Sequence, residues 1–445
     1  FDFTVETLIV GAGACGLIAA LSAMEAGQEV LVIEADAVPS GSTALSAGLI
    51  PAAGTKIQQA AGIMDSTALF AADIQAKAHQ ENNQALVDLL AQNAAEVIDW
   101  LTQTHGLAFS LVDDFDYPGH SSRRMHGLPT RAGSELIDAL RSAAERAGID
   151  IICGRRAETL YFAGGLVHGV AALRPDGGIE TIGCDRLILA CNGFGGNRAL
   201  VSEHMPDIEN GLWFGHEGNR GEAVLWANQI GAATEHLGAF QGHGNVAHPH
   251  GILITWATIT GGGVQVNAAG ERFWNEAQGY SEAARAVLSQ AQGVAYAIFD
   301  GRISQIAEQF EDFKRAQSEG AIKSAETLEE LAEDLGLPAE ALCKTIADIS
   351  PNSTDRFGRT FGETVLSPPF CGVRVTGALF HTQGGLKVNA RAQIQKPNGI
   401  AFENIFACGG AACGVSGPDV SGYLSGNGLL AAAVLGRIAG RASRG

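Results

Sequence analysis

Residues 8–36 read LIVGAGACGLIAALSAMEAGQEVLVIEAD, and this stretch decides the fold. An apolar run leads into a glycine-rich turn, a segment of small residues follows, and a second apolar run ends at Glu34. The order predicts a strand, a tight turn, a helix and a second strand. In such a unit Gly11 allows the sharp turn, Gly13 lets the backbone approach a pyrophosphate, and Gly16 lets the helix pack against the strand.

The same stretch predicts a dinucleotide site. The first turn of the helix, which includes Ala14, presents backbone amide donors to an anion. Glu34 stands at the end of the second strand, where a carboxylate accepts hydrogen bonds from ribose hydroxyls. A glycine pattern alone is a weak signal in a chain with 58 glycines. Here the strand before it, the helix after it and the acid are all present, which is the context the motif requires.

Composition excludes several classes of protein. With 46% hydrophobic and 17% charged residues, the chain is typical of a globular protein of two or more domains. Its 29 Lys and Arg against 48 Asp and Glu give a net charge of -19, which argues against nucleic acid as a partner. No apolar run reaches the length of a membrane span, and because the first strand begins within a few residues we expect no signal peptide. The eight cysteines include no C-x-x-C pair, so we expect a reducing, cytoplasmic compartment and no metal site.

Two further segments have the character of a cofactor site. Residues 38–55 form a loop of small and hydroxyl-bearing residues directly after Glu34, which suits close approach to a flat cofactor. Residues 185–190 predict another buried strand, which ends in the glycine-rich sequence of residues 191–196. Residues 113–133 are loop-like and rich in His and Arg; most of these side chains fit a structural role, and Tyr117 is the best pocket candidate.

Three glycine-rich strand ends together resemble a known superfamily: the N-terminal unit, LILACNGFGG at residues 187–196 and NIFACGGAACG at residues 404–414. They are similar to the FAD-binding flavoproteins that include fumarate reductase, succinate dehydrogenase and 3-ketosteroid dehydrogenase. The resemblance implies an α/β fold with a Rossmann-like FAD-binding domain, residues 1–227 and 361–445, and an inserted α+β capping domain, residues 228–360. Members that attach FAD covalently carry a His in the loop after the ribose acid, so Ser42 and Thr43 imply noncovalent FAD.

The resemblance also implies which residues contact FAD. Many relatives carry an acid at the position of Gly410, which puts the contact to the ribityl chain in doubt. The expected set is Gly11, Gly13, Ala14, Gly16, Glu34, Ser42, Thr43, Ser46, Ala47, Gly48, Ala157, Asn192, Gly193, Gly384, Gly409, Gly410 and Leu429.

Two tyrosines indicate which branch of the superfamily this chain resembles. In fumarate reductases an Arg stands four residues after the N-E of R-F-x-N-E, and a second Arg stands near the C-terminal glycine turn; here these positions hold Tyr280 and Tyr423. The loss of both removes a fixed charge and a bidentate carboxylate clamp. In 3-ketosteroid dehydrogenases a Tyr at the first position is the base, and one at the second hydrogen-bonds the carbonyl. The alternative is that both are buried aromatic residues with satisfied hydroxyls.

The sequence FHTQGGL at residues 380–386 supplies the third element. The match implies that His381 points into the substrate site, where it can donate to a carbonyl or carboxylate oxygen. Its presence beside two tyrosines suggests a small cyclic ketone, one that could bear a carboxylate. Further substrate contacts are expected from Tyr117, His248, Gly426 and Asn427, and His248 is favoured over His243 and His250.

These observations predict an FAD-dependent oxidoreductase acting on CH–CH donors: a ketone desaturase in which Tyr280 removes a proton and flavin N5 accepts the hydride. The substrate would be a cyclohexanone-type ketone or a 3-ketosteroid, and the electron acceptor an external quinone, electron carrier or O2. One alternative is a fumarate-reductase-like enzyme for an unsaturated carboxylate. Another is a flavin-binding redox sensor without turnover. The sequence does not fix the ring substituents, the direction or the oligomeric state.

Overall fold

The computed structural model describes residues 1–113 and 117–442, which form two compact units. Unit 1 comprises residues 1–205, 215–240 and 381–445, and unit 2 comprises residues 206–214 and 241–380. The sequence-based boundaries at 228 and 360 differ from these. The difference at the second boundary arises because strand β17 (Phe370–Thr382) pairs along most of its length with strands of unit 2.

Unit 1 is built on a mostly parallel sheet with the strand order β19-β20-β9-β1-β2-β6 and an antiparallel β7–β8 extension on β9. Strand β1 lies between β9 and β2 and is parallel to both, as expected for buried apolar runs at the centre of a doubly wound sheet. The strands of unit 1 are β1 (Phe3–Val10), β2 (Val30–Ile33), β3 (Ile50–Pro51), β4 (Ser110–Leu111), β5 (Met125–Gly127), β6 (Asp150–Ile152), β7 (Arg156–Ala163), β8 (Leu166–Leu173), β9 (Ile179–Leu189), β11 (Thr234–Glu235), β18 (Gly385–Leu386), β19 (Gln393–Gln395) and β20 (Ala401–Ala407).

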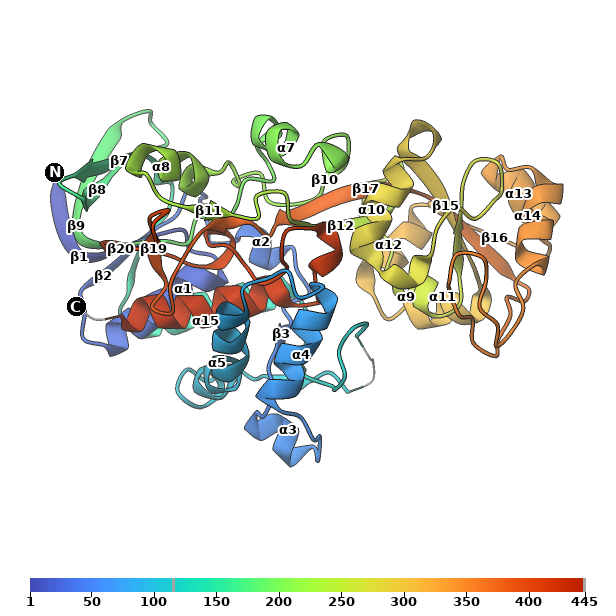
Figure 1. Cartoon of the computed structure of the whole chain (residues 1–445), viewed down its shortest axis with the longest axis horizontal. Coiled ribbons are helices and arrows are strands. Elements are labelled where there is room, and N and C mark those ends of the chain that lie inside the picture. The colour runs from blue at the N-terminus through green and yellow to red at the C-terminus, as the bar shows by residue number, and fades with distance from the viewer. Residues whose placement is uncertain (114–116, 443–445) are drawn as a thin grey trace. The chain divides into compact units, whose positions relative to one another are not determined.

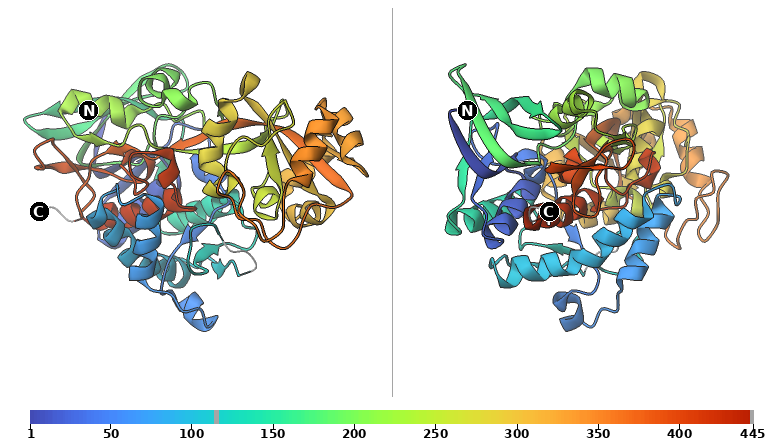
Figure 2. Two further views of the ribbon diagram at one scale, coloured as in Figure 1. Left: turned by 45° about the vertical axis from the view of Figure 1, so that its right-hand side comes forward. Right: turned by 60° about the vertical axis from the view of Figure 1, so that its left-hand side comes forward.

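Helices cover this sheet and its connections. The helices of unit 1 are α1 (Ala14–Glu25), α2 (Gly41–Ala44), α3 (Lys56–Ala60), α4 (Thr67–Lys77), α5 (Gln84–Gln103), α6 (Gly133–Arg146), α7 (Arg198–His204), α8 (Glu222–Ile230) and α15 (Asn427–Arg441), with short 3-10 turns at Gly409–Ala411 and Val420–Gly422. Helices α4 and α5 lie side by side, and α5 also packs against α15 (Figure 2).

The first and last helices of the chain pack closely. Helix α15, drawn in red, runs alongside α1 in Figure 1. A Cβ added at Gly436 would lie 2.6 Å from the Cys15 carbonyl oxygen, and one added at Gly440 would meet the backbone of Ala19. Residues four apart share a helix face, so these two glycines let the backbones approach over a full turn. The C-terminal helix is thereby fixed against the helix that follows the dinucleotide turn.

Unit 2 holds a seven-stranded sheet in the order β13-β12-β17-β15-β14, with β10 and β16 paired to β17. Its strands are β10 (Leu212–Trp213), β12 (Phe240–Ala247), β13 (Ile252–Leu253), β14 (Val264–Val266), β15 (Val294–Asp300), β16 (Ile322–Ala325) and β17; the first residue of β12 and the last two of β17 belong to unit 1. Its helices are α9 (Ala257–Thr260), α10 (Tyr280–Leu288), α11 (Gly301–Ala307), α12 (Glu311–Ser318), α13 (Leu328–Leu335) and α14 (Ala339–Ala347), with 3-10 turns at Pro206–Ile208, Glu276–Gln278 and Ala291–Gly293.

Each unit buries its own apolar core. The core of unit 1 is rich in Ala, Val, Ile and Leu from the parallel strands and from α1, α5 and α15. Within the described residues, no helix has both the length and the apolar character needed to cross a lipid bilayer.

Candidate functional site

The dinucleotide turn has the geometry that its sequence predicts. Gly11 has a φ of 105°, and a Cβ on Gly16 would overlap the Gly11 carbonyl oxygen, so neither position accepts a side chain without strain. The Ala12 amide donates to Glu34 Oε2 at 2.7 Å, and the Asp36 amide donates to Oε1 at 2.9 Å. These bonds fix the buried Glu34 carboxylate at the end of β2, beside the turn that leads into α1.

The loop after Glu34 lies against the start of α1. The Ala14 amide donates to Thr43 Oγ1 at 3.1 Å. Ser46 Oγ donates to the Thr43 carbonyl at 2.7 Å and accepts from the Gly48 amide at 3.0 Å, whereas Ala47 is exposed. Ser46 and Gly48 therefore hold the loop in shape, while Thr43 reaches the amide end of α1.

A second turn follows β9. Asn192 has a φ of 65°, its Oδ1 accepts from the Gly193 amide at 2.9 Å, and its Nδ2 donates to Ser42 Oγ at 2.8 Å. A Cβ on Gly410 would overlap Asn192 Oδ1. The Asn192 amide thus occupies the space that any side chain at position 410 would need, which is a physical reason for glycine where many relatives carry an acid.

Other expected cofactor residues contribute chiefly to packing around this site. Ala157 pairs with Ala172 in the β7–β8 ladder and belongs to the buried core. Gly409, with a φ of 57°, would bring an added Cβ to 3.1 Å from Cys15 Sγ, and Leu429 packs against the same core. A Cβ on Gly384 would overlap the His236 carbonyl oxygen. Their proposed contacts to FAD stay predictions.

His381, at the end of β17, is held by a pair of side chains. Ser416 Oγ donates to Gln383 Oε1 at 2.7 Å, and Gln383 Nε2 lies 2.8 Å from His381 Nδ1. Because the Gln383 oxygen accepts from Ser416, its nitrogen can donate to Nδ1, which favours a ring proton on Nε2 over the tautomer in which Nδ1 donates to the Thr382 carbonyl oxygen, 3.1 Å away. Burial lowers the pKa of His381 to about 4, so the ring is a neutral donor near pH 7.

Tyr423 lies beside His381 in unit 1, with ring centroids 5.6 Å apart and nearly perpendicular planes. Burial raises the pKa of Tyr423 to about 12, although backbone hydrogen bonds with Gly428 and Gly426 lower it in part. Gly426 has a φ of 87° and is the N-cap of α15. His381 and Tyr423 together therefore present two neutral hydrogen-bond donors.

Buried polar atoms without a protein partner also occur here. Asn427 is 1% exposed and both of its side-chain polar atoms lack a hydrogen bond, as does Thr382 Oγ1. Buried polar groups are normally paired, so these atoms keep hydrogen-bonding capacity that a ligand could use. A Cβ on Gly428 would lie 2.8 Å from His381 Cε1, which puts the start of α15 against the His381 ring.

In unit 2, Tyr280 begins α10 within a group of aromatic rings. The His243 ring is stacked on Tyr280 with centroids 5.0 Å apart and planes at 18°, and it also stacks on Phe380 at 5.4 Å. Trp256 meets Tyr280 edge-on at 6.4 Å. Burial alone lowers the pKa of His243 to about 3, so this imidazole is neutral.

The histidine that stacks on Tyr280 is His243, whereas the sequence favours His248 as the substrate contact, which stays a prediction. His248 is half-buried and its amide donates to the Arg374 carbonyl, whereas His243 lies inside β12 and is 6% exposed. Every second residue of a strand faces the same side, so alternation could have predicted which side of the sheet His243 faces. That prediction needed the bounds of β12, which the sequence did not supply.

A buried ion cluster fixes the segment before Tyr280. Glu276, which is fully buried, contacts Arg272 at 2.5 Å and Arg359 at 3.1 Å, and it accepts from the Gln265 amide at 3.0 Å. Asp355 binds the other side of Arg272. The R-F-x-N-E sequence therefore has a structural role here, since its charges anchor the turn that leads into α10.

The loop of residues 117–133 is mainly structural, in line with the sequence-based preference. Arg124 is buried and paired with Asp65 and Asp73, and His126 bonds Thr55 and the Arg124 carbonyl. Tyr117 is half-buried against a small apolar cluster that includes Met125. The rest of the predicted loop, residues 114–116, lies outside the described residues.

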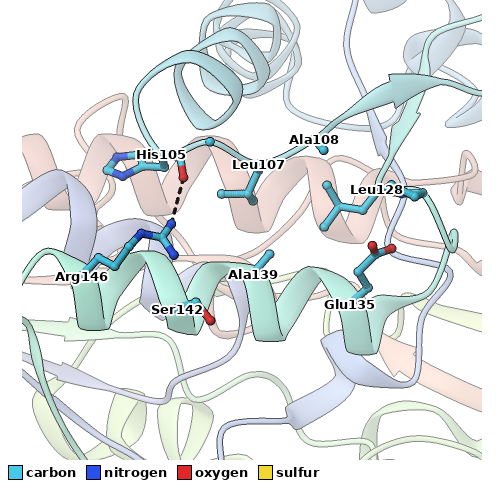
Figure 3. Close-up of a pocket in the computed structure, with 10 residues that line it drawn as sticks. His105, Leu107, Ala108, Leu128, Glu135, Ala139, Ser142 and Arg146 are labelled. Atoms are coloured by element: carbon cyan, nitrogen blue, oxygen red, sulfur yellow. Dashed lines mark hydrogen bonds between the residues drawn. The ribbon is translucent and has the colours of Figure 1, made fainter.

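A cavity of about 250 Å³ lies elsewhere in unit 1, between α6 and the segment after α5 (Figure 3). Arg146 extends toward the His105 carbonyl, to which it donates at 3.1 Å, and Glu135 lies toward the other end of α6. None of the residues predicted to bind cofactor or substrate lines this cavity.

Comparison with known proteins agrees with this geometry. Residues 6–429 match the FAD binding domain family. The probable fumarate reductase Ifc3 of Shewanella frigidimarina is 30% identical over 98% of this chain and 74% of its own length. The open conformation of a flavocytochrome c3 fumarate reductase superposes with a TM-score of 0.84 at 29% identity, covering 98% of this chain and 78% of the other. The 3-ketosteroid-Δ4-(5α)-dehydrogenase of Rhodococcus jostii superposes with a TM-score of 0.78 at 24% identity, covering 99% and 97%, a likeness in fold alone.

The glycine turn and the acid at the end of β2 are the features of a site that holds a dinucleotide cofactor. The chain belongs to the FAD binding domain family, and its cofactor is FAD. The residues present fit FAD. The N-terminal amides of α1 suit the pyrophosphate and Glu34 suits the ribose, while Thr382 and Asn427 have unpaired polar atoms that can bond the cofactor. The predictions of an α/β FAD-binding fold and of the superfamily are confirmed, and the chain is an FAD-dependent oxidoreductase of the kind that acts on CH–CH donors.

Proposed function

We propose that this enzyme transfers hydrogen at a carbon–carbon bond conjugated to a carbonyl group, with Tyr280 as the proton-transferring residue. Bound FAD supplies a site that accepts or donates hydride. The chain then has to polarise the carbonyl, move one proton and keep water out. The observation that carries the proposal is the pair of adjacent neutral donors, the half-buried His381 and the buried Tyr423, together with the unpaired side-chain amide of the buried Asn427.

The two donors suit a carbonyl oxygen on which negative charge develops. His381 Nε2–H is fixed by the Gln383 bond to Nδ1, and the Tyr423 hydroxyl is protonated because its pKa is about 12. Donors set in advance toward a developing oxyanion typically contribute ~3 kcal/mol each to catalysis. Their polarisation acidifies the α-carbon, which lowers the demand on the base.

Tyr280 has support for a role in proton transfer. Its half-buried ring is stacked on the neutral His243 ring and meets Trp256 edge-on, so aromatic neighbours fix its position. The Glu276 cluster holds the turn before it. A phenol has a reference pKa near ~10, so it can return a proton to an enolate carbon in the reductive direction and take one in the oxidative direction.

Two substrate classes follow, each with its own support. The comparisons favour an unsaturated carboxylate, because relatives similar over most of the chain are named fumarate reductases. The site residues favour a ketone, because Tyr280 and Tyr423 stand where a carboxylate-binding enzyme of this superfamily would carry Arg. A cyclic enone or ketone that also bears a carboxylate satisfies both arguments.

The test is anaerobic mixing of the purified protein with substrates of each class. Photoreduced enzyme is mixed with 2-cyclohexenone, 4-oxocyclohex-2-enecarboxylate or fumarate, and oxidised enzyme with the saturated partners, while flavin absorbance is followed. Tyr280→Phe should slow the reaction at least ~100-fold, the scale of general acid–base catalysis. Tyr296→Phe is the matched control, because Tyr296 is a buried tyrosine on β15 of the same unit. A reaction unaffected by Tyr280→Phe would contradict the assignment.

A further inference from the structure

Three polar side chains from distant parts of unit 1 meet at one oxygen atom. Ser42 Oγ accepts from Asn192 Nδ2 at 2.8 Å and from Asn219 Nδ2 at 3.0 Å. Asn192 follows β9, Asn219 precedes α8, and Ser42 belongs to the short α2, so the contact joins segments up to 177 residues apart. Asn219 is 3% exposed, whereas Ser42 is half-buried.

The two amides determine what Ser42 can do. A serine oxygen has two lone pairs and one hydrogen. The orientation of the Asn192 amide is fixed because its oxygen accepts from the Gly193 amide at 2.9 Å, which leaves its nitrogen for Ser42. With both lone pairs engaged, the Ser42 hydroxyl can act toward a ligand only as a donor.

The position of Ser42 indicates the acceptor. Its neighbour Thr43 accepts from the Ala14 amide in the first turn of α1, and a Cβ on Gly41 would lie 4.0 Å from Gly13 Cα. Ser42 therefore lies next to the turn where a pyrophosphate is expected. Phosphate oxygens are strong acceptors, and a bond to a charged acceptor is about twice as strong as a neutral one.

We propose that Asn192 and Asn219 are positioning residues that hold the Ser42 hydroxyl as a donor to the pyrophosphate of FAD. Asn192 adopts left-handed backbone to do this, a conformation that Asn tolerates better than most residues. The Gly193 and Gly410 backbones leave no space for a bulkier arrangement, since a Cβ at either would overlap a neighbour. This inference rests on FAD binding alone and does not depend on the substrate.

The test measures FAD release from diluted holoenzyme, read as recovery of flavin fluorescence, together with phosphorus NMR of the bound pyrophosphate. Ser42→Ala removes the donor and should weaken FAD binding roughly tenfold or more, with a shifted phosphate resonance. Asn192→Gly keeps the backbone conformation, removes the orienting amide and should weaken binding roughly five- to tenfold. Asn352→Gly is the matched control, because Asn352 also has positive φ but lies in unit 2.

The double variant Ser42→Ala/Asn192→Gly distinguishes positioning from general packing. If Asn192 acts through Ser42, the double variant binds FAD as Ser42→Ala does, since the second change has nothing left to orient. Asn192→Asp should bind more weakly than Asn192→Gly, because a carboxylate accepts the Ser42 proton and turns it away from the phosphate. Effects that multiply in the double variant would overturn the proposal, and so would an Asn192→Asp variant that binds FAD as wild type does. Thermal unfolding of each apoprotein separates either result from loss of folding.

Discussion

Replacing Gln383 by Met removes the side-chain hydrogen bond that the described residues offer to His381 Nδ1. Gln383 Nε2 lies 2.8 Å from Nδ1, while the Thr382 carbonyl oxygen lies 3.1 Å from the same atom. With Gln383 present, Nδ1 accepts and Nε2 carries the proton. In the Gln383→Met variant, the tautomer with the proton on Nδ1 becomes more stable, because Nδ1–H can donate to the Thr382 carbonyl oxygen. Nε2 then carries no proton and cannot donate to a substrate carbonyl oxygen.

The size of the effect follows from the two hydrogen bonds. Loss of the Gln383 bond takes about 1 kcal/mol from the productive tautomer, and the bond to Thr382 adds a similar amount to the other. A change of about 2 kcal/mol shifts the tautomer ratio roughly thirtyfold. We therefore expect kcat for a conjugated carbonyl substrate to fall roughly ten- to thirtyfold, with little change in FAD binding.

Imidazole nitrogen NMR of the histidine-labelled protein reads the tautomer directly, and single-turnover flavin reoxidation reads the rate. Gln383→Glu should be more damaging than Gln383→Met, because its carboxylate can only accept and so stabilises the Nδ1–H form. Gln393→Met is the control, since Gln393 is a half-buried glutamine on β19 that bonds backbone carbonyls. A wild-type His381 protonated at Nδ1, or a Gln383→Met enzyme of normal rate, would refute the reasoning.

Three further predictions concern the same protein. Tyr423→Phe should lower kcat ~100- to 1,000-fold while the variant stays folded, measured by steady-state kinetics with circular dichroism as the check, because one oxyanion donor is lost. Desolvation lowers the pKa of His120, His126 and His381 to about 4 and that of His243 to about 3, so the folded state binds fewer protons than the unfolded state. Their stabilising contribution is full above pH ~6.5 and is lost as pH falls toward 4, which urea unfolding at a series of pH values will detect; constant stability from pH 7 to 4 would contradict it. FAD should be released completely by acid precipitation, because the loop after Glu34 carries Ser42 and Thr43 in place of a His; yellow colour retained in the pellet would show a covalent bond.

Much of the fold was predictable from local pattern. The glycine turn, the buried apolar runs and the small-residue helix after Gly426 predicted β1, α1, β2, β9 and α15, because each needs only neighbouring residues for its signal. The border of unit 2 was harder, since β17 looks like part of the C-terminal segment until its pairing with β15 is known. Strand pairing between distant segments leaves little trace in one sequence.

The candidate site divides in the same way. Roles for His381 and the two tyrosines could be predicted because these residues stand inside recognisable motifs. The roles of Gln383, Asn219 and His243 depend on contacts that sequence spacing does not reveal. Gln383 accepts a hydrogen bond from Ser416, Asn219 donates to Ser42 from 177 residues away, and the His243 ring stacks on Tyr280. Gly410 is similar, since only the position of the Asn192 amide explains the absence of a side chain there.

The most direct test of the central claim is the rate at which 4-oxocyclohex-2-enecarboxylate reoxidises photoreduced enzyme without oxygen, in wild type and in Tyr280→Phe. The account predicts rapid recovery of flavin absorbance in wild type and in Tyr296→Phe, and recovery at least ~100-fold slower in Tyr280→Phe. Equal rates in wild type and Tyr280→Phe, or no reoxidation by this compound, 2-cyclohexenone or fumarate, would contradict it.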